Sequence, residues 1–298
     1  RRDIDADECM STELSLILCT LGRTTPLERL LVSLQAQLDS GFELVIVDQN
    51  PPGYLADFVA RAGAALRVQY LRSVPGLSRA RNVGIRASRG ELLAFPDDDC
   101  WYEPDTVASI RRRFTQYPEF AIVTGRTTDA RGRDSNGKFS GQSAAITRQN
   151  VWYCGTSNSV FVRRALALKL GGFDETLGVG AGTPFGAGEE TDFLLRALSS
   201  GERGFFFHDL LVHHDQADVR INQDTLRRAA SYARGFGRVL RLHRYSRAYL
   251  AMRLVRNCAA AMVALLGINL PFARLKLVWA RYTLAGYRSH VAGARGRV

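Results

Sequence analysis

Three consecutive aspartates, Asp97, Asp98 and Asp99, follow the apolar stretch "ELLAFP" and are the first place in the sequence where chemistry is expected. Adjacent carboxylates repel one another, so a fold that holds three of them at the end of a buried strand needs a cation nearby. Carboxylates bind hard divalent ions, which commonly also bind substrate phosphates. We therefore expect Mg²⁺ or Mn²⁺ and a nucleotide diphosphate here, although an isolated D-x-D also occurs in exposed turns.

The sequence around these aspartates predicts the elements that position them. Helical segments are predicted near residues 53–61 and 78–87, and the near-continuous apolar runs predict buried strands at residues 14–19, 42–48, 66–71, 91–96, 120–125 and 159–164. Repeated strand–helix units of this kind indicate an α/β fold with a mostly parallel sheet that is covered on both faces. Because ligands of such sheets bind beyond the carboxyl ends of the strands, we expect Asp48 and the three aspartates on one rim.

Shorter motifs predict how some of these elements begin and end. After the first strand we expect a helix with Thr25 as its N-cap, Pro26 at the first helical position and Glu28 completing a capping box. Residues 126–150, rich in Gly, Ser and Arg, are expected to form a mobile loop. The glycine-rich "GVGAGTPFGAG" at residues 178–188 predicts a flexible loop that can close over a ligand.

The charge of the chain is divided unevenly along its 298 residues. The net charge is +11, yet residues 220–298 hold 16 Lys and Arg against one acid, Asp224. This pattern favours a polyanionic partner, either nucleic acid or an anionic lipid surface. We expect a disordered lead-in at residues 1–12, a catalytic domain at 13–219 and a basic helical region at 220–298.

The apolar stretch "NCAAAMVALLGINLPFA" at residues 257–273 is shorter than the roughly 20 residues that span a bilayer. We therefore expect an interfacial or re-entrant helix pair on the membrane surface. The first residues, "RRDIDADECMSTE", show no signal-peptide pattern, and the five cysteines form no C-x-x-C pair. Both features favour the cytoplasm, with the protein peripheral at the inner face of the cell membrane.

Several segments, in this order, resemble the family-2 glycosyltransferases, which are inverting enzymes with the GT-A fold. The matching segments are "LSLILCTLGR", "ELVIVDQN", "GLSRARNVGIRASRGELLAFPDDDCWYEPD", "GTSNSVFVRRALALKLGGFDE" and "GEETDFLLRAL". They cover roughly residues 13–215, and the block at residues 76–105 is the most specific of them. The resemblance implies a GT-A domain followed by the basic helical extension.

The resemblance also implies the residues of the donor site. Asp99 would be the direct metal ligand, Asp97 would contact the ribose or the metal, and Asp98 would fill the variable position. Arg79 would lie near the donor, whereas Arg81 is equally well explained as a solvated helix charge. The full set of expected donor-binding residues is Thr20, Gly22, Arg23, Asp48, Arg79, Asn82, Asp97, Asp98 and Asn158.

An inverting transfer needs a general base that takes the proton from the acceptor hydroxyl. The family places this base in a Glu-Asp pair at the start of a late helix, where this sequence has Glu189, Glu190, Thr191 and Asp192. Glu190 aligns with the base, Asp192 is the second candidate, and Glu189 completes the catalytic set. Acids in a first helical turn also favour the helix dipole, so a structural role stays open.

The remaining expected site residues are aromatic or histidine. Of the two histidines that follow the strand at residues 210–212, we prefer His213 over His214 as a third metal ligand, and we expect His208 to be structural. Trp152 and Tyr153 are expected to bind the acceptor by stacking on a sugar ring, although buried aromatics are also common in cores.

Together these features predict a metal-dependent, inverting glycosyltransferase of the hexosyltransferase type. It would move a sugar from a nucleotide-diphosphate donor, a UDP-sugar by expectation, to a saccharide or lipid-linked saccharide acceptor in cell-surface polysaccharide assembly. The alternative is a nucleotidyltransferase on a similar fold, against which "GLSRARNVGI" and the late acidic pair both argue. A nucleic-acid-binding protein is suggested only by the pI of about 9.8, because no aromatic platform accompanies the basic residues.

Overall fold

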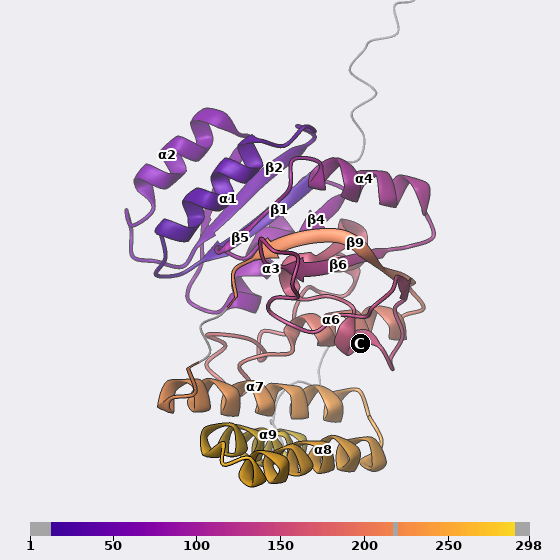
Figure 1. Ribbon diagram of the computed structural model, residues 1–298. Coiled ribbons are helices and arrows are strands. Elements are labelled where there is room, and N and C mark those ends of the chain that lie inside the picture. The colour runs from indigo at the N-terminus through magenta and orange to yellow at the C-terminus, as the bar shows by residue number, and fades with distance from the viewer. Residues whose placement is uncertain (1–12, 217–219, 290–298) are drawn as a thin grey trace, which may run out of the picture. The chain divides into compact units, whose positions relative to one another are not determined.

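The computed structural model describes residues 13–216 and 220–289, so the predicted lead-in at residues 1–12 lies outside the described residues (Figure 1). The chain divides into two compact units. The first unit comprises the chain up to Phe173 together with Phe193–Ala217, and the second comprises Asp174–Asp192 together with Asp218–Val298. Helix α6 (Glu189–Ser199) begins in the second unit and continues into the first.

The first unit is built around one mixed sheet with the strand order β3-β2-β1-β4-β8-β6-β9-β5, and β7 pairs with β9. The first four strands of the chain are mutually parallel: β1 (Leu14–Thr20), β2 (Phe42–Asp48), β3 (Val68–Arg72) and β4 (Leu92–Ala94). The predicted α/β fold class is confirmed. The later strands add antiparallel pairs to this parallel half: β5 (Cys100–Trp101), β6 (Ile122–Thr128), β7 (Ala144–Ala145), β8 (Val160–Arg163) and β9 (Gly204–His214).

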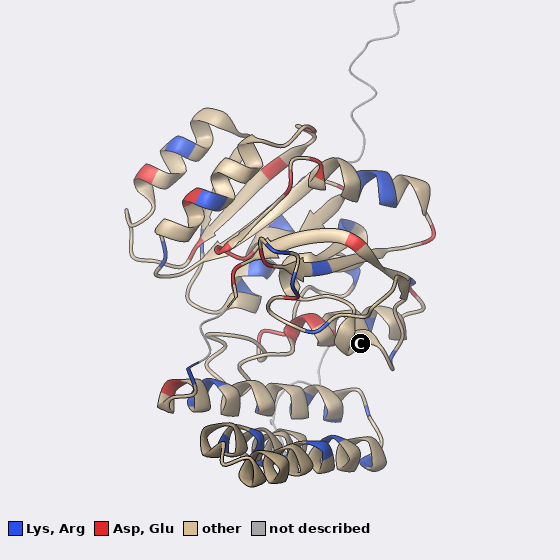
Figure 2. Cartoon of the chain, viewed as in Figure 1, with Lys and Arg blue, Asp and Glu red and all other residues tan. Residues whose placement is uncertain are grey.

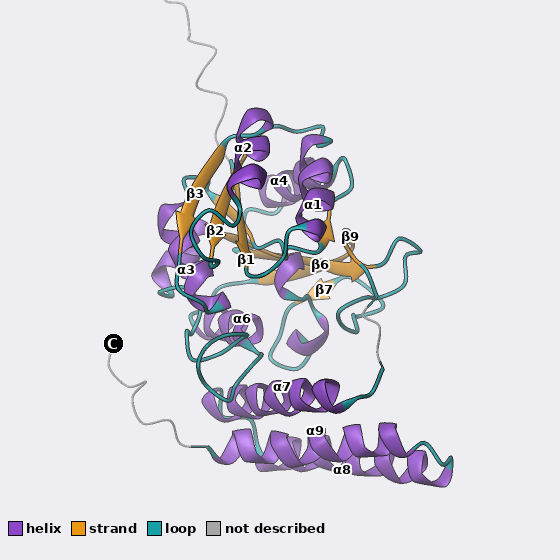
Figure 3. Cartoon of the chain, turned by 90° about the vertical axis from the view of Figure 1, so that its left-hand side faces the viewer, coloured by secondary structure: helices purple, strands orange, loops and turns teal. Residues whose placement is uncertain are grey.

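Helices cover both faces of the sheet, which explains why β1 and β2 are buried along their whole length (Figure 3). Leu16 and Leu18 share one core cluster with three helices, α1 (Thr25–Gln35), α2 (Ala56–Ala65) and α4 (Thr106–Gln116). Ile17 points to the opposite face because side chains alternate along a strand. There α3 (Leu77–Ala87) packs closely, since a Cβ on Gly84 would overlap the Ile17 side chain.

Three local predictions differ from the structure. The N-cap of α1 is Thr24 rather than Thr25, and no side-chain cap hydrogen bond forms. With Thr24 as the N-cap, Glu28 is one position too far along the helix for a capping box, and it pairs with Arg61 on α2. Helix α2 starts at Ala56, after Gly53 in a left-handed conformation (φ 82°). The loop predicted from residue 126 begins later, because β6 continues to Thr128 beside β9 and β7 lies within it.

Short elements connect the later strands of the first unit. The 3-10 helices η1 (Val151–Tyr153) and η2 (Ser157–Ser159) precede β8, and α5 (Arg164–Lys169) follows it. Strand β9 pairs with β5 so that His214 lies opposite Cys100. This pairing brings the end of β9 next to the residues that follow β4.

The second unit contains three long helices, α7 (Gln223–Leu242), α8 (Arg247–Leu266) and α9 (Leu270–Arg288), of which α9 packs against both others. The predicted basic helical extension is therefore present. Glycines allow α7 and α9 to approach closely, since a Cβ on Gly286 would overlap the backbone carbonyl of Arg234. Small residues, Ala261, Ala264 and Ala273, form the buried contact between α8 and α9.

Helix α8 bears on the expected interfacial or re-entrant helix pair, which stays a prediction. Its 20 residues are long and apolar enough to cross a bilayer by length and composition, and it is the one such helix among residues 13–216 and 220–289. The uninterrupted apolar run is shorter because it starts after Arg256, but the helix itself begins at Arg247.

Candidate active site

The three aspartates lie in the loop after β4, where side chains from two other strand ends meet them. Thr20, the last residue of β1, donates a hydrogen bond to Asp98 Oδ2 at 2.8 Å. Arg23 Nη1 lies 2.9 Å from Asp98 Oδ1 and also pairs with Asp99. His214 Nε2, at the end of β9, lies 3.1 Å from Asp99 Oδ1.

The surroundings divide the aspartates into different electrostatic states. Burial raises the pKa of Asp97 to about 6, against the opposing effect of Arg81 and with the support of the neighbouring carboxylates. Burial also raises the pKa of Asp98. For Asp99, by contrast, hydrogen bonds and charge from His214 and Arg23 outweigh burial and lower the pKa to about 2. The cluster thus combines one carboxylate with a lowered pKa, Asp99, with two whose pKa is raised, Asp97 and Asp98.

Arg81 is a buried partner of this cluster, so the alternative of a solvated helix charge is wrong. It is 1% exposed, its Nη2 lies 3.3 Å from Asp97 Oδ1, and its guanidinium carbon lies 5.4 Å from the centre of the Phe173 ring. Arg79 is half-buried, and its Nη1 donates to the backbone oxygen of Pro75 at 3.0 Å. The donor contact of Arg79 stays a prediction.

Asp48, at the end of β2, lies on the same rim and is held by two residues that the sequence analysis did not identify. Its Oδ1 accepts hydrogen bonds from the backbone N and from Nδ2 of Asn50, at 2.8 and 2.7 Å. Its Oδ2 accepts from the Tyr70 hydroxyl at 2.9 Å. Asn50 Oδ1 in turn accepts from the backbone N of Gly22 at 2.5 Å. The pattern Asp48-x-Asn50 is typical of an Asx turn, so the contact with Asn50 could have been predicted from the sequence. The contact with Tyr70 could not, because it depends on the register between β2 and β3.

The histidine on the aspartates is His214 rather than the preferred His213. Successive side chains on β9 point to opposite faces, so only one of the two can meet Asp99. His213 Nδ1 lies 3.2 Å from Thr128 Oγ1, its Nε2 lies 2.7 Å from Glu103 Oε1, and its ring stacks on Trp101. His208 Nε2 pairs with Arg126 Nη1 at 2.8 Å, in keeping with a structural role.

Two predicted donor-site amides are engaged with the protein itself. Asn82 Nδ2 donates to the Phe173 carbonyl at 2.9 Å and its Oδ1 accepts from the Phe173 backbone N at 2.7 Å, so this side chain holds the segment after α5. Asn158 is fully buried, and its Oδ1 accepts from Thr156 and Thr127. Asn158 Nδ2 has no hydrogen-bond partner among the described residues.

The expected acceptor residues, Trp152 and Tyr153, lie in η1 and are half-buried. The backbone oxygen of Tyr153 accepts from Ser140 N at 2.9 Å, which connects η1 to the preceding loop. This backbone contact says nothing of a sugar, so the stacking role of Trp152 and Tyr153 stays a prediction.

The acidic first turn of α6 lies in the second unit. Glu189 and Asp192 are buried and Glu190 is half-buried. His243, which follows the last residue of α7, places its Nε2 2.8 Å from Asp192 Oδ1. This pair could not be predicted from the sequence, because the two residues are 51 positions apart and no local motif joins them.

The donor set fits a hard divalent ion that is shared with a substrate. No three His, Cys, Asp or Glu side chains within residues 13–216 and 220–289 are grouped as a ready-made metal cage. Mg²⁺, however, is commonly held by one or two carboxylates and completed by substrate phosphates and water. Asp97 and Asp99 offer such carboxylates, and the raised pKa of Asp97 reflects burial together with the negative charge of its neighbours.

Comparison with known proteins bears on these observations. The family model described as glycosyl transferase family 2 matches residues 15–167. An uncharacterized glycosyltransferase of Haemophilus influenzae is 26% identical over 195 residues, which are 62% of each chain. The putative glycosyltransferase EpsH of Bacillus subtilis is 30% identical over 129 residues, 39% of this chain and 37% of the relative. The chain thus matches less than two thirds of the length of these relatives.

Solved structures share the fold over nearly the whole chain. TarS 1-349 of S. aureus in complex with UDP-GlcNAc has a TM-score of 0.58 at 18% identity, covering 93% of this chain and 92% of that one. The mannosyltransferase PcManGT of Pyrobaculum calidifontis, in complex with GDP-Man and Mn²⁺, has a TM-score of 0.62 at 16% identity and covers 93% and 86%. At these identities the likeness establishes the fold, which is the expected GT-A fold.

Proposed function

The chain belongs to glycosyl transferase family 2, and we propose that it moves a sugar from a nucleotide-diphosphate donor to a saccharide acceptor with inversion at the anomeric carbon. The observation that carries this proposal is the convergence of Asp48 and the aspartate cluster at the carboxyl ends of parallel strands. Related folds bind UDP-GlcNAc in TarS and GDP-Man with Mn²⁺ in PcManGT, which supports a nucleotide-sugar donor. A UDP-sugar is the first candidate.

In this proposal the two ends of the rim have different tasks. Asp48, oriented by Asn50 and Tyr70, accepts hydrogen bonds from the base or the ribose. Asp97 and Asp99 hold the divalent ion, Mn²⁺ or Mg²⁺, which when bound would neutralise the departing diphosphate. Arg23 adds a positive charge beside Asp98 and Asp99.

The transfer is a single displacement. The acceptor hydroxyl oxygen forms a bond to the anomeric carbon while the bond from that carbon to the diphosphate oxygen breaks, and the diphosphate leaves with the electron pair. We assign Glu190 as the base that takes the hydroxyl proton, because Asp192 is buried and already bound by His243. Glu190 is more accessible, and it occupies the position of the base in the family pattern.

Calorimetry with UDP, GDP, CDP and dTDP, with Mn²⁺ or with a chelator, tests the donor site. We expect one nucleotide to bind only with metal, and Asp99→Asn to weaken its binding by about 100-fold, the upper range for loss of a group that supports a metal. Asp57→Asn, an exposed position on α2, is the matched control and should bind as the unaltered protein does. If no nucleotide binds to the folded protein with metal present, the assignment of the aspartates is wrong.

The alternative, a nucleotidyltransferase, differs in its products. It would release pyrophosphate from a nucleoside triphosphate, whereas sugar transfer releases a nucleoside diphosphate. Incubation with a sugar phosphate and each triphosphate, followed by pyrophosphate detection, separates the two activities. Pyrophosphate release that depends on Asp99 would favour the alternative.

We further propose a lipid-linked acceptor in cell-surface polysaccharide assembly and a place at the inner face of the cell membrane. Positive charge supports this, because no Asp or Glu follows Asp224 and Figure 2 shows Lys and Arg along α7, α8 and α9. Apolar exposure supports it as well: at the α8–α9 turn Leu266, Ile268 and Leu270 are 86%, 83% and 62% exposed. Ile268 also has a φ of 56°, which is unfavourable for a β-branched residue.

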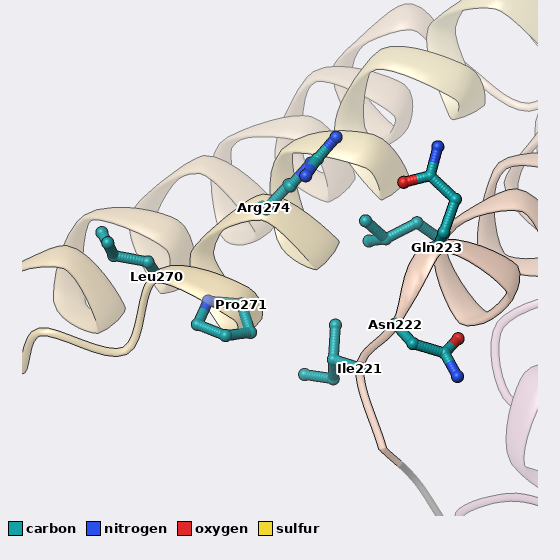
Figure 4. A pocket seen from close by; sticks show the side chains of 7 residues that line it. Ile221, Asn222, Gln223, Leu270, Pro271 and Arg274 are labelled. Carbon is teal, nitrogen blue, oxygen red and sulfur yellow. The ribbon is translucent and has the colours of Figure 1, made fainter.

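A hollow of about 300 Å³ lies beside this turn and is lined by both apolar and charged side chains (Figure 4). Leu270 and Pro271 supply apolar lining, Arg274 supplies charge, and the chain before and at the start of α7 closes the other side. Apolar side chains buried at the acyl boundary, together with arginines on anionic headgroups, are the usual components of an interfacial membrane contact.

Flotation with phosphatidylglycerol-containing and with pure phosphatidylcholine vesicles tests this surface. We expect salt-sensitive binding to the anionic vesicles, and a loss of most binding in the double variant Leu266→Ser/Ile268→Asn. The control is Val32→Ser/Leu38→Asn, because these residues of the first unit are also exposed, at 62% and 80%. Equal flotation of both variants, or a change of oligomeric state in place of lost flotation, would argue against the membrane assignment.

A further inference from the structure

We propose that His243 is a positioning residue for the acidic turn of α6, and that one face of α7 supports the catalytic segment. This inference rests on the proposed function, in which Glu190 takes the acceptor proton. It gives a second task to a helix that lies outside residues 15–167, the part matched by the family model.

The first observation is the contact between His243 and Asp192. Nε2 and Oδ1 are 2.8 Å apart, and the two side chains are 9% and 5% exposed. An imidazole that donates to a buried carboxylate forms a charge-assisted hydrogen bond, which is stronger than a neutral one. The imidazole therefore holds Asp192 against the end of α7.

The position of Asp192 on its helix determines what this contact does. Residues two positions apart on an α-helix project about 200° from one another around its axis. Glu190 therefore points away from α7 when Asp192 is bound to it. By fixing Asp192, His243 fixes the rotation of the turn and with it the direction of the Glu190 carboxylate.

The second observation is a row of contacts along α7. Ser231, Gly235 and Val239 are spaced four residues apart and so lie on one face of α7, and His243, the residue after the helix, continues this spacing. Ser231 O accepts from the backbone N of Gly186 at 3.2 Å. A Cβ on Gly235 would overlap the Ala187 carbonyl.

The row continues to the start of α6. A Cβ on Gly188, which has a φ of 99°, would lie 2.8 Å from Val239 Cγ2. Residues 186, 187, 188 and 192 thus meet residues 231, 235, 239 and 243 in the same order. The end of the glycine-rich loop, expected from the sequence to be flexible, is packed backbone to helix directly before the acidic turn.

Steady-state kinetics of His243→Ala and His243→Gln test the positioning role. Gln Nε2 can donate to the same carboxylate, so it should restore most of what alanine loses. We expect alanine to lower kcat by about 10- to 100-fold, the usual effect of removing a group that orients a functional side chain, with the donor KM unchanged. The double variant His243→Ala/Asp192→Ala should be no worse than His243→Ala alone, because both changes remove the same contact.

A second pair of variants tests the row without touching a titratable group. Gly235→Ala should also lower kcat, because its new methyl displaces the Ala187 carbonyl. Gly63→Ala on α2, where a Cβ meets nothing within 4 Å, should leave kcat unchanged. Thermal unfolding of each variant shows whether the protein remains folded at the assay temperature.

The outcomes separate this inference from the function on which it rests. If Glu190→Gln is inactive while His243→Ala keeps full kcat, the positioning role is wrong and the base assignment stands. If Glu190→Gln is fully active, the base assignment itself is wrong. A glutamine variant as slow as alanine in a folded protein, or a change in donor KM alone, would also overturn the positioning role.

Discussion

The two acidic groups of this protein are stabilised in different ways. Asp97, Asp98 and Asp99 are consecutive in a loop, and their partners come from separate segments, with Arg23 after β1 and His214 at the end of β9. The acids of α6 stand in a helical turn, whose dipole favours them, and Asp192 is bound by one imidazole. In the proposed function, the aspartate cluster can exchange a side-chain partner for a metal ion, whereas the contact with His243 holds the Asp192 carboxylate in one direction.

The sharpest test of this difference is Glu190→Gln compared with Asp192→Asn. Loss of a general base typically lowers the rate by about 100- to 10 000-fold, and we expect this fall in kcat for Glu190→Gln with donor binding retained. Asp192→Asn should cost less, because its amide oxygen can still accept from His243 and only the charge of the pair is lost. Initial-rate assays with calorimetric donor binding measure both quantities, and the reverse order of effects would identify Asp192 as the base.

The aspartate loop should be most sensitive to the loss of its buried cation. Arg81→Met leaves Asp97 beside two other carboxylates, and removing one partner of a buried ion pair costs about 3 to 5 kcal/mol in the free energy of unfolding. Urea unfolding measures this cost. Arg86→Met, at an exposed position of the same helix, should have little effect. An equal loss of unfolding free energy in both variants would mean that the two arginines stabilise helix α3 itself, and that the contact of Arg81 with Asp97 adds nothing.

The packing of the second unit can be tested without changing any charge. Gly286→Ala forces a methyl group against the Arg234 carbonyl, and overpacking of this kind costs about 1 to 3 kcal/mol. Gly267→Ala is the control, because its φ is −84° and a Cβ there meets nothing closer than 3.6 Å. Thermal unfolding compares the two, and a loss in the Gly267 variant alone would contradict the assigned α7–α9 contact.

The smallest expected effect is a change in pH dependence at Asp97. Its pKa of about 6 in the folded protein exceeds its ordinary value of 3.8, so the folded state binds more protons between these values. The contribution of Asp97 to stability should therefore fall as pH rises from about 4 to about 6. Asp97→Asn removes this fall, so the stability of the variant relative to the unaltered protein should rise with pH.

Urea unfolding at several pH values, without divalent ions, measures that difference. Asp99 does not interfere, because its pKa is lowered to about 2 and its stabilising contribution is lost only at more acidic pH. Asp57→Asn should show no such trend. A flat difference for Asp97→Asn would mean that Asp97 is ionised throughout this range.

The predictable part of the molecule is the part encoded in local patterns. Apolar runs predicted β1, β2 and the segment that contains β4. An aspartate directly after such a run predicted that Asp48 and Asp97 lie at the carboxyl-end edge of the sheet. Both signals depend on neighbouring residues only. The topology of an open α/β sheet supplied the rest of that inference.

The partners of these residues depend on register and could not be predicted in the same way. A shift of one position along β9 exchanges His213 and His214 between the faces of the sheet, and no local pattern sets that register. Arg81 and Tyr70 required knowledge of which face of α3 is buried and how β3 pairs with β2. His243 lies on another helix altogether, so only the folded chain reveals it.

The second unit is discontinuous in the sequence, because Asp174–Asp192 and Asp218–Val298 are separated by the last strand of the sheet. During synthesis the acidic turn of α6 therefore leaves the ribosome before the helix that supports it. A chain that stops between β9 and His243 contains every strand of the sheet but lacks the imidazole that binds Asp192. On the proposed function, premature stop codons in this region would therefore remove the residue that positions the proposed base together with the proposed membrane surface.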